Sequence, residues 1–199
     1  MRISFAGLSG NARPLRVGFS PVWFLAAGIA FFILMTSPMG CGDDGGTKAK
    51  IRHPQDFLPP ATEAMQKNGP PRTATDTADL QDIVKDGYEV YTNNGFVEMV
   101  EQLYQGTVGQ ESAAIKIWIF DMGTAKNAES LHDELLQKGS WEEWNELGDE
   151  DHRQTKLLGF VILFRLDKYS VELEIDSKSQ EAEDLLVLFA THIDYEIRE

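Results

Sequence analysis

The clearest alternation of apolar and polar positions lies in residues 114–121, which read Ala-Ile-Lys-Ile-Trp-Ile-Phe-Asp. In an extended strand, alternate side chains point to opposite faces, so the isoleucines would share one face. The other face would carry Lys116, Trp118 and Phe120. Large apolar groups on both faces predict a central strand, with neighbours on either side.

Three segments place apolar residues at helical spacing. The first is 77–93, where Asp76 or Thr77 can cap the start. The second begins after Thr124 and runs to Gly139. The third extends to about Tyr195, after a possible capping box at 177–180.

Strand-like alternation recurs at 96–104, 157–165 and 169–175, and the last two segments predict a hairpin around Asp167. Strands that come as hairpins predict an α+β domain. We expect an antiparallel or mixed sheet of four to five strands, with about three helices packed mainly on one face. The Ile115–Ile119 face should form the core under the second and third helices, where it would pack against Leu131, Leu135, Leu185 and Phe189.

Residues 1–40 have the pattern of an export signal. Three arginines precede an uncharged stretch that contains the apolar run Val22–Met35, which at 14 residues is shorter than a membrane-spanning helix. Gly40-Cys41 follows, and this junction resembles a bacterial lipoprotein signal, although Pro38 and Met39 are poor matches to it. We expect lipid on Cys41, with an uncleaved anchor helix or plain secretion as the alternatives. In each case the domain is extracytoplasmic, and in the first two it is anchored to a membrane.

Residues 41–56 are polar and begin with Gly-Asp-Asp-Gly-Gly after the cysteine, which is typical of a flexible tether. All eight prolines lie at or before Pro71. Residues 57–199 therefore predict a single α+β domain behind the tether.

The charge balance excludes whole classes of partner. The chain carries 18 basic and 32 acidic side chains, a net charge of −14. Phosphate backbones repel such a surface, so no nucleic acid is expected. Anionic lipids repel it too, so the membrane should be reached through lipid on Cys41. A single cysteine also excludes a disulfide framework and a cysteine-based zinc cluster.

Residues 57–197 resemble a group of functionally uncharacterised bacterial exported domains that often carry lipoprotein signals. The most specific match is Phe120-Asp121-Met122-Gly123, followed by Ala125 and Ala128. The other matching pieces are Leu58-Pro59, Gly69-Pro70-Pro71-Arg72, Gly87-Tyr88-Glu89-Val90-Tyr91, Gly95-Phe96, Leu163-Phe164 and Tyr169-Ser170-Val171. The resemblance implies the fold and export, and it implies no activity.

Two places could carry ligand chemistry near the first helix. Asp121 precedes Gly123-Thr124 between a strand and a helix, where backbone N–H groups could hold an anion. Glu89 lies close to Tyr91, and a carboxylate held near aromatic rings could act as a general acid or base. The alternatives are a turn with a helix cap at Gly123-Thr124, and a surface carboxylate at Glu89.

Trp141 and Trp144 flank two glutamates. A capping box from Ser140 to Glu143 would make a short helix with both rings on one side, whereas a strand would put the rings on opposite faces. One ring could contact a partner or a carbohydrate. The four histidines lack metal-ligand spacing, and Asp149–His152 fits a solvated acidic loop, so no metal site and no cofactor are expected.

These features favour a membrane-tethered lipoprotein with a non-catalytic binding domain for an unidentified envelope protein or ligand. The alternative is a small envelope enzyme or ligand carrier with a pocket near Glu89, Tyr91 and Asp121. A pocket where polar groups converge around Glu89 and Asp121 would favour the alternative.

Overall fold

The structure is a computed structural model, and it describes residues 51–199. The expected signal peptide and Cys41 lie outside the described residues. Within residues 51–199, no helix has the length and apolar character needed to cross a membrane.

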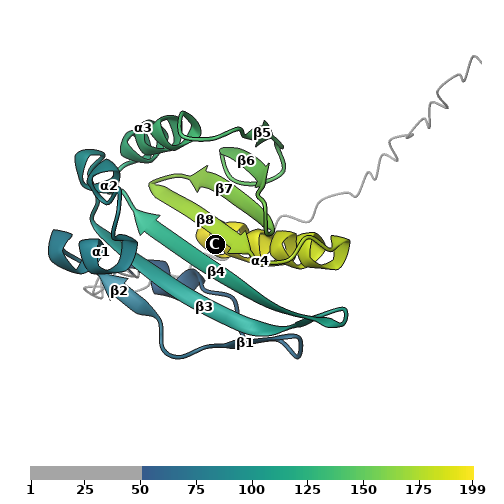
Figure 1. The fold of residues 1–199 in the computed structure, drawn as a ribbon. Coiled ribbons are helices and arrows are strands. Elements are labelled where there is room, and N and C mark those ends of the chain that lie inside the picture. Colours follow the sequence, from purple (N-terminus) through teal and green to yellow (C-terminus); the bar gives the residue numbers. More distant parts are fainter. Residues whose placement is uncertain (1–50) are drawn as a thin grey trace, which may run out of the picture. The chain divides into compact units, whose positions relative to one another are not determined.

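One antiparallel sheet organises the described part of the chain (Figure 1). Its strands follow the order β1-β3-β4-β8-β7-β6-β5, and β2 pairs with β3 outside this path. The strands are β1 (Met65–Lys67), β2 (Arg72–Ala74), β3 (Glu98–Val108), β4 (Glu111–Asp121), β5 (Glu142–Glu143), β6 (Glu150–Thr155), β7 (Phe160–Leu166) and β8 (Tyr169–Ile175). The α+β class and the antiparallel pairing are confirmed, whereas the expected count of four to five strands is wrong, because short edge strands of two or three residues add to the sheet.

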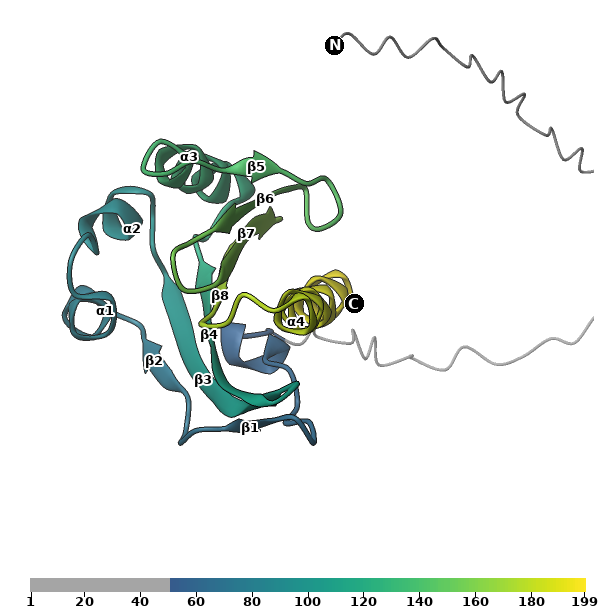
Figure 2. The same ribbon diagram turned by 45° about the vertical axis from the view of Figure 1, so that its right-hand side comes forward.

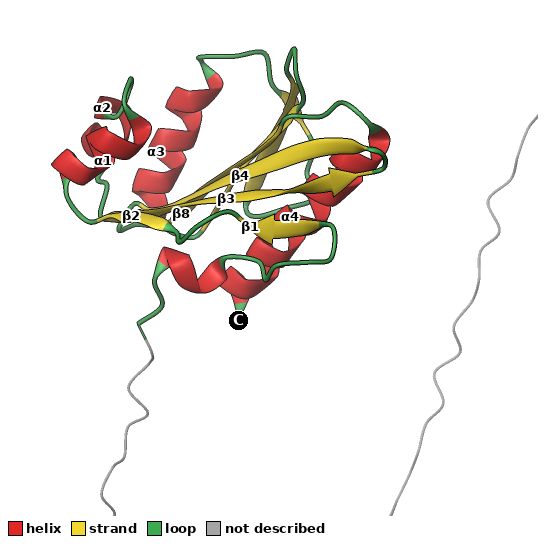
Figure 3. Ribbon diagram, turned by 60° about the horizontal axis from the view of Figure 1, so that its bottom comes forward, coloured by secondary structure: helices red, strands yellow, loops and turns green. Residues whose placement is uncertain are grey.

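Helices cover both faces of this sheet. The helices α1 (Thr77–Val84), α2 (Glu89–Asn93) and α3 (Ala125–Leu136) lie on one face. The long helix α4 (Gln180–Arg198) and the 3-10 turn η1 (Pro54–Phe57) lie on the other (Figures 2 and 3). Three of the four α-helices therefore lie on one face, as the sequence predicts, but the longest helix covers the other face.

The side chains on the two faces of β4 belong to two separate cores, which is why the helices divide between the two faces of the sheet. Ile115, Ile117 and Ile119 are fully buried and belong to one core with Leu186 and Phe189 of α4. Leu131 and Leu135 of α3, which the sequence pattern predicts as partners of these isoleucines, pack in a second core instead. Successive strand residues point in opposite directions, so α3 and α4 meet different side chains of the same strand.

The second core packs Phe120 and Met99 of the sheet against residues of α1, α2 and α3. It contains Leu80, Val90, Tyr91, Ala128 and Leu131. Two predicted helix caps hold these elements: the carboxylate of Asp76 accepts from the backbone N–H of Asp79 at 2.9 Å, and the Thr124 hydroxyl accepts from that of Asn127 at 3.2 Å.

Residues 77–93 form two helices instead of the single predicted helix. The chain leaves α1 at Lys85, which has a φ of +61°, and turns again at Gly87, with a φ of +83°. A left-handed residue stops an α-helix, and only glycine adopts it without a Cβ penalty. The break rotates Tyr91 of α2 onto the sheet, where its ring stacks on Phe120 with centroids 4.2 Å apart.

The last residues of the expected tether contact the domain. Arg52 forms an ion pair with Glu196 of α4 at 3.0 Å, and His53 lies 2.9 Å from a carboxylate oxygen of Glu98. Phe57 is 1% exposed and packs edge-on against Tyr169. Residues 52–57 therefore help to cover the α4 face of the sheet.

Candidate functional site

A polar hollow lies on the sheet face that carries α1 and α2, and we call it the Tyr91 groove. Its volume is about 410 Å³. It is lined by Arg72, Ile83, Val84, Lys85, Tyr91, Glu101, Lys116, Trp118, Phe120 and Glu172. Strands β2, β3, β4 and β8 supply the floor, and α1, the Lys85 turn and α2 supply the wall.

Strand register explains why these side chains meet. Trp118 of β4 lies opposite Glu101 of β3 on one side and opposite Glu172 of β8 on the other. Cross-strand neighbours on one face lie about 4.5–5.5 Å apart, so the two carboxylates flank the indole ring. Lys116 and Phe120 stand two residues away on the same face of β4, which makes the floor both aromatic and charged.

Glu101 fixes one side of the floor. One of its oxygens accepts the indole N–H of Trp118 at 2.9 Å, and the other accepts from Arg72 at 3.1 Å. Arg72 also reaches the carboxylate of Asp82 at 3.0 Å. These charge-assisted bonds hold the Trp118 ring in one orientation, so the aromatic floor is preformed.

Other polar groups in the Tyr91 groove are free to meet a ligand. Within residues 51–199, the side chains of Lys85, Lys116, Tyr91 and Glu172 have no hydrogen-bond or ion-pair partner, and the Lys116 ammonium lies 5.0 Å from the centre of the Trp118 ring. Burial raises the pKa of the Tyr91 phenol, and the charge of Glu172 adds to this shift. Burial also raises the pKa of Glu172 itself.

The structure separates the residues that the sequence places in one pocket. Tyr91 lines the groove, but Glu89 is exposed on α2 and does not. Asp121 is 3% exposed at the end of β4, where its carboxylate accepts from the backbone N–H of Gly123 at 2.8 Å and from Lys168 at 2.6 Å. Polar groups therefore do not converge around Glu89 and Asp121. The carboxylate of Asp121 already accepts from the N–H of Gly123, one of the groups considered for an anion.

Trp141 and Trp144 flank the short strand β5, so the strand alternative is confirmed and the capping box does not start a helix. The pairing of Glu142 and Glu143 with β6 holds this segment at the sheet edge, which overrides the local capping signal. Trp144 lines a smaller hollow of about 140 Å³ beside α4, together with Arg153, Phe160 and Glu183. The indole nitrogen of Trp141 is buried without a partner in the described residues.

The predicted acidic loop at 149–152 is largely a strand. Asp151 of β6 is fully buried, and its carboxylate accepts backbone N–H bonds from Asn145, Glu146 at 2.9 Å and Leu147 at 2.6 Å. The side chain thus closes the turn that leads into β6. The neighbouring Glu150 and His152 point to the opposite face, toward His132 of α3.

His132, Glu150 and His152 are a group of metal-ligating side chains that the sequence analysis missed. His132 is fully buried, and burial lowers its pKa to about 4, although the charge of Glu150 opposes this shift. The two histidines are 20 residues apart in the chain, so no local spacing reveals them. The groove residues had a weak signal: Lys116 and Trp118 share a face of a strand that is otherwise apolar.

Comparison with known proteins finds a structural likeness but no family. No family model matches the chain, and no curated protein matches it. The extracellular domain of PknH from Mycobacterium tuberculosis has a similar structure, with a TM-score of 0.46 and 10% sequence identity. The match covers 73% of this chain and 95% of that one. The resemblance to uncharacterised exported domains therefore stays a prediction.

Proposed function

We propose that this chain is an extracytoplasmic, membrane-tethered binding domain that holds a small anionic ligand with a flat, apolar body in the Tyr91 groove. The observation that carries the proposal is the pair of unpartnered lysines, Lys85 and Lys116, beside the aromatic floor of the groove. Ligand sites combine an apolar lining with a few convergent polar groups, and the Tyr91 groove has both.

The local charge favours an anion. Arg72, Lys85 and Lys116 face the groove against Glu101 and Glu172. Arg72 and Glu101 form an ion pair at 3.1 Å and neutralise each other. The raised pKa of Glu172 favours its uncharged form, which repels an anion less than a carboxylate does. This small positive excess lies on a chain whose net charge is −14. A carboxylate or phosphate group would therefore find its attractive contacts here, with its apolar part over Trp118.

The lining offers donors for binding and lacks the common nucleophiles. None of the described residues that line the groove is a serine, threonine, cysteine or histidine, and the carboxylates among them are Glu101, which Arg72 and Trp118 engage, and Glu172. The two carboxylates that an enzyme would use on sequence grounds, Glu89 and Asp121, lie outside it. The remaining donors suit hydrogen bonds and charge pairing with a ligand.

Two related dyes test the groove. The anion 8-anilinonaphthalene-1-sulfonate and the neutral N-phenyl-1-naphthylamine share a flat apolar body and differ in the charged group. We expect the anion to bind more tightly, as measured by the rise in dye fluorescence. The variant with Lys85→Gln and Lys116→Gln should lose most of this preference, and Trp118→Leu should weaken both dyes.

The control is Lys178→Gln, which removes an exposed lysine on the loop before α4 and should leave both affinities unchanged. Equal binding of the two dyes to the parent chain would contradict an anion site. An anion preference that survives the double lysine change would place the binding elsewhere on the surface.

The tether is a separate part of the proposal, and it rests on the basic residues, the Val22–Met35 run and Cys41. Several acyl chains would hold the chain firmly, at about 0.8 kcal/mol per buried CH₂ group. Radiolabelled palmitate fed to the bacterium should enter the parent chain but not Cys41→Ser. An unlabelled parent chain that stays in the membrane at full precursor mass would instead indicate an uncleaved anchor helix.

A further inference from the structure

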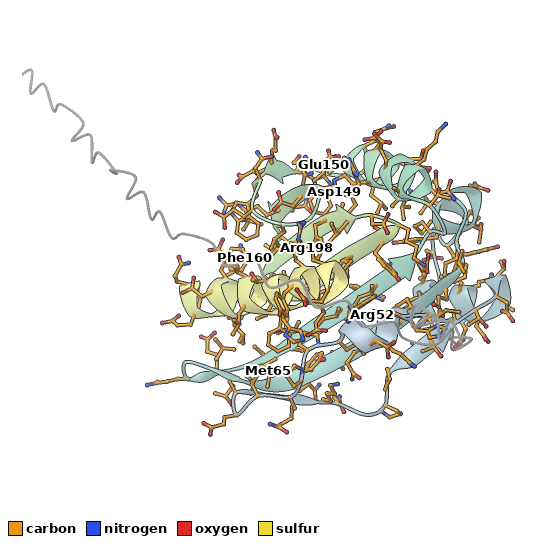
Figure 4. All side chains as sticks on the ribbon, turned by 180° about the vertical axis from the view of Figure 1, so that it is seen from behind. Arg52, Met65, Asp149, Glu150, Phe160 and Arg198 are labelled. Carbon is orange, nitrogen blue, oxygen red and sulfur yellow. The ribbon has the colours of Figure 1, made fainter. Side chains whose placement is uncertain are left out.

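Three metal-ligating side chains from two elements meet at the end of the sheet away from β1, and we call them the His132 cluster: His132, Glu150 and His152. His132 comes from α3, and the other two come from β6. Residues 150 and 152 are two apart in a strand, so both side chains point to the face that α3 covers. Figure 4 shows Glu150 on the opposite side of the molecule from Met65 of β1.

The distances match those between ligands of one metal ion. Nε2 of His132 lies 3.1 Å from Nδ1 of His152 and 3.9 Å from a carboxylate oxygen of Glu150. One ligand atom of each residue lies within 4.8 Å of the others. Around a tetrahedral zinc ion with bonds of about 2.0–2.2 Å, neighbouring ligand atoms lie about 3.3 Å apart. Small side-chain adjustments therefore suffice to close the site.

The surroundings hold the ligands in place. Arg165 of β7 lies opposite Glu150 in the sheet and donates to one of its carboxylate oxygens at 3.1 Å, which leaves the other oxygen directed at the histidines. Arg165 is also 3.8 Å from Asp149, so its charge is shared between two carboxylates. Carboxylate ligands of metals are commonly oriented by such outer hydrogen bonds.

The environment of His132 is unusual without an ion. Its imidazole is 0% exposed, and its Nδ1 has no hydrogen-bond partner among the described residues. All of the polar contacts of this buried ring are therefore to the other two members of the cluster. The Nε2 atom of His132 has the ring nitrogen of His152 as its hydrogen-bond partner, and an ion between the two nitrogens would replace this bond with two coordinate bonds, while the proton of His132 would stay on Nδ1.

We propose that the His132 cluster binds a divalent transition-metal ion, for which Zn²⁺ fits best, with water as the remaining ligand. Two imidazole nitrogens and one carboxylate oxygen are a donor set that zinc accepts, whereas Mg²⁺ and Ca²⁺ prefer oxygen ligands alone. The bound ion would join α3 to β6, two elements separated by the 137–149 connection. The His132 cluster and the Tyr91 groove have no residue in common, so the zinc proposal and the anion proposal can be tested independently.

The test titrates Zn²⁺ into the full chain in detergent, after removal of metal with EDTA, and follows binding by calorimetry. His152→Gln and Glu150→Gln remove one ligand each from partly exposed positions, so they should fold. Each should weaken zinc binding by more than the roughly 10–100-fold that loss of an outer hydrogen bond causes. The matched control, His192→Gln on α4, should bind zinc as the parent does. Mg²⁺ and Ca²⁺ at the same concentrations should not compete.

A second measurement does not depend on variants. Imidazole nitrogen resonances in a two-dimensional NMR spectrum should shift on zinc addition for two histidines, and His152→Gln should remove one of these signals. The proposal is overturned if the parent chain shows no saturable zinc binding. Zinc affinity that is unchanged in both His152→Gln and Glu150→Gln, or a shift confined to His53 and His192, would overturn it equally.

Discussion

The indole N–H of Trp118 donates to a carboxylate oxygen of Glu101 at 2.9 Å, across the β3–β4 pair, while Arg72 binds the other oxygen of the same carboxylate at 3.1 Å. One acidic residue thus orients the aromatic floor of the Tyr91 groove and neutralises one of its three cations. The groove depends on this carboxylate more than on any group that the sequence singles out.

Glu101→Gln should cost about 1–2 kcal/mol of unfolding free energy, because a neutral amide replaces a charged acceptor that serves two donors. Urea denaturation measures the change, and the NMR shift of the Trp118 indole proton reports its loss locally. Asp82→Asn is the control: Asp82 is 84% exposed and pairs only with Arg72, so it should change stability by less than about 0.5 kcal/mol. Equal effects of the two changes would show that the Trp118 bond contributes nothing.

Asp151→Ala should destabilise the domain by about 3–5 kcal/mol. The buried carboxylate accepts three backbone N–H groups from residues 145–147, and its removal leaves all three donors without a partner. The exposed Glu143→Ala on β5 should be nearly neutral in the same denaturation assay. A small effect of Asp151→Ala would mean that water replaces the carboxylate, and that the turn is not held by it.

Because the two cores are separate, substitutions in them should change the free energy of unfolding additively. Ile117→Val should cost about 0.5–1.5 kcal/mol and Leu131→Ala about 2–5 kcal/mol. Because Ile117 and Leu131 lie in different clusters on opposite faces of β4, the double variant should equal the sum within about 0.5 kcal/mol. A larger interaction energy would indicate direct packing between α3 and the isoleucine face, as the sequence pattern had predicted.

Glu172 should make stability depend on pH. Its folded-state pKa is raised above the ordinary value of 4.5, mainly by burial, so the folded state keeps its proton at a pH where the unfolded state has lost it. The stability of the parent chain should therefore fall, relative to Glu172→Gln, as the pH rises from 4.5 through the folded-state pKa.

Thermal unfolding of Glu172→Gln and the parent chain across this pH range measures the difference. Glu181→Gln, an exposed residue on α4, is the control and should run parallel to the parent. If the parent gains stability relative to Glu172→Gln as the pH rises, then a positive group stabilises the Glu172 carboxylate, and the groove is more cationic than we infer.

The local features of this protein follow from residues that are close together in the chain. Period-2 alternation predicted one buried side for Ile115, Ile117 and Ile119 and one for Tyr169, Val171, Leu173 and Ile175. The structure confirms both and places them on the same face of the sheet. The caps at Asp76 and Thr124 and the hairpin at Asp167 were also predictable. Such signals depend on residues a few positions apart, which report which side of an element is apolar and where the element ends.

Which elements face each other depends on the packing of the whole domain. A pattern in β4 cannot say that α4 covers its isoleucines while α3 covers the side of Phe120, because either helix has a suitable apolar stripe. Trp118 meets Glu101 and Glu172 through the register of three strands, and His132 meets His152 through the packing of α3 over the sheet. Each of these contacts joins residues 17 or more positions apart, so it exists only once strand order, register and helix placement are fixed together.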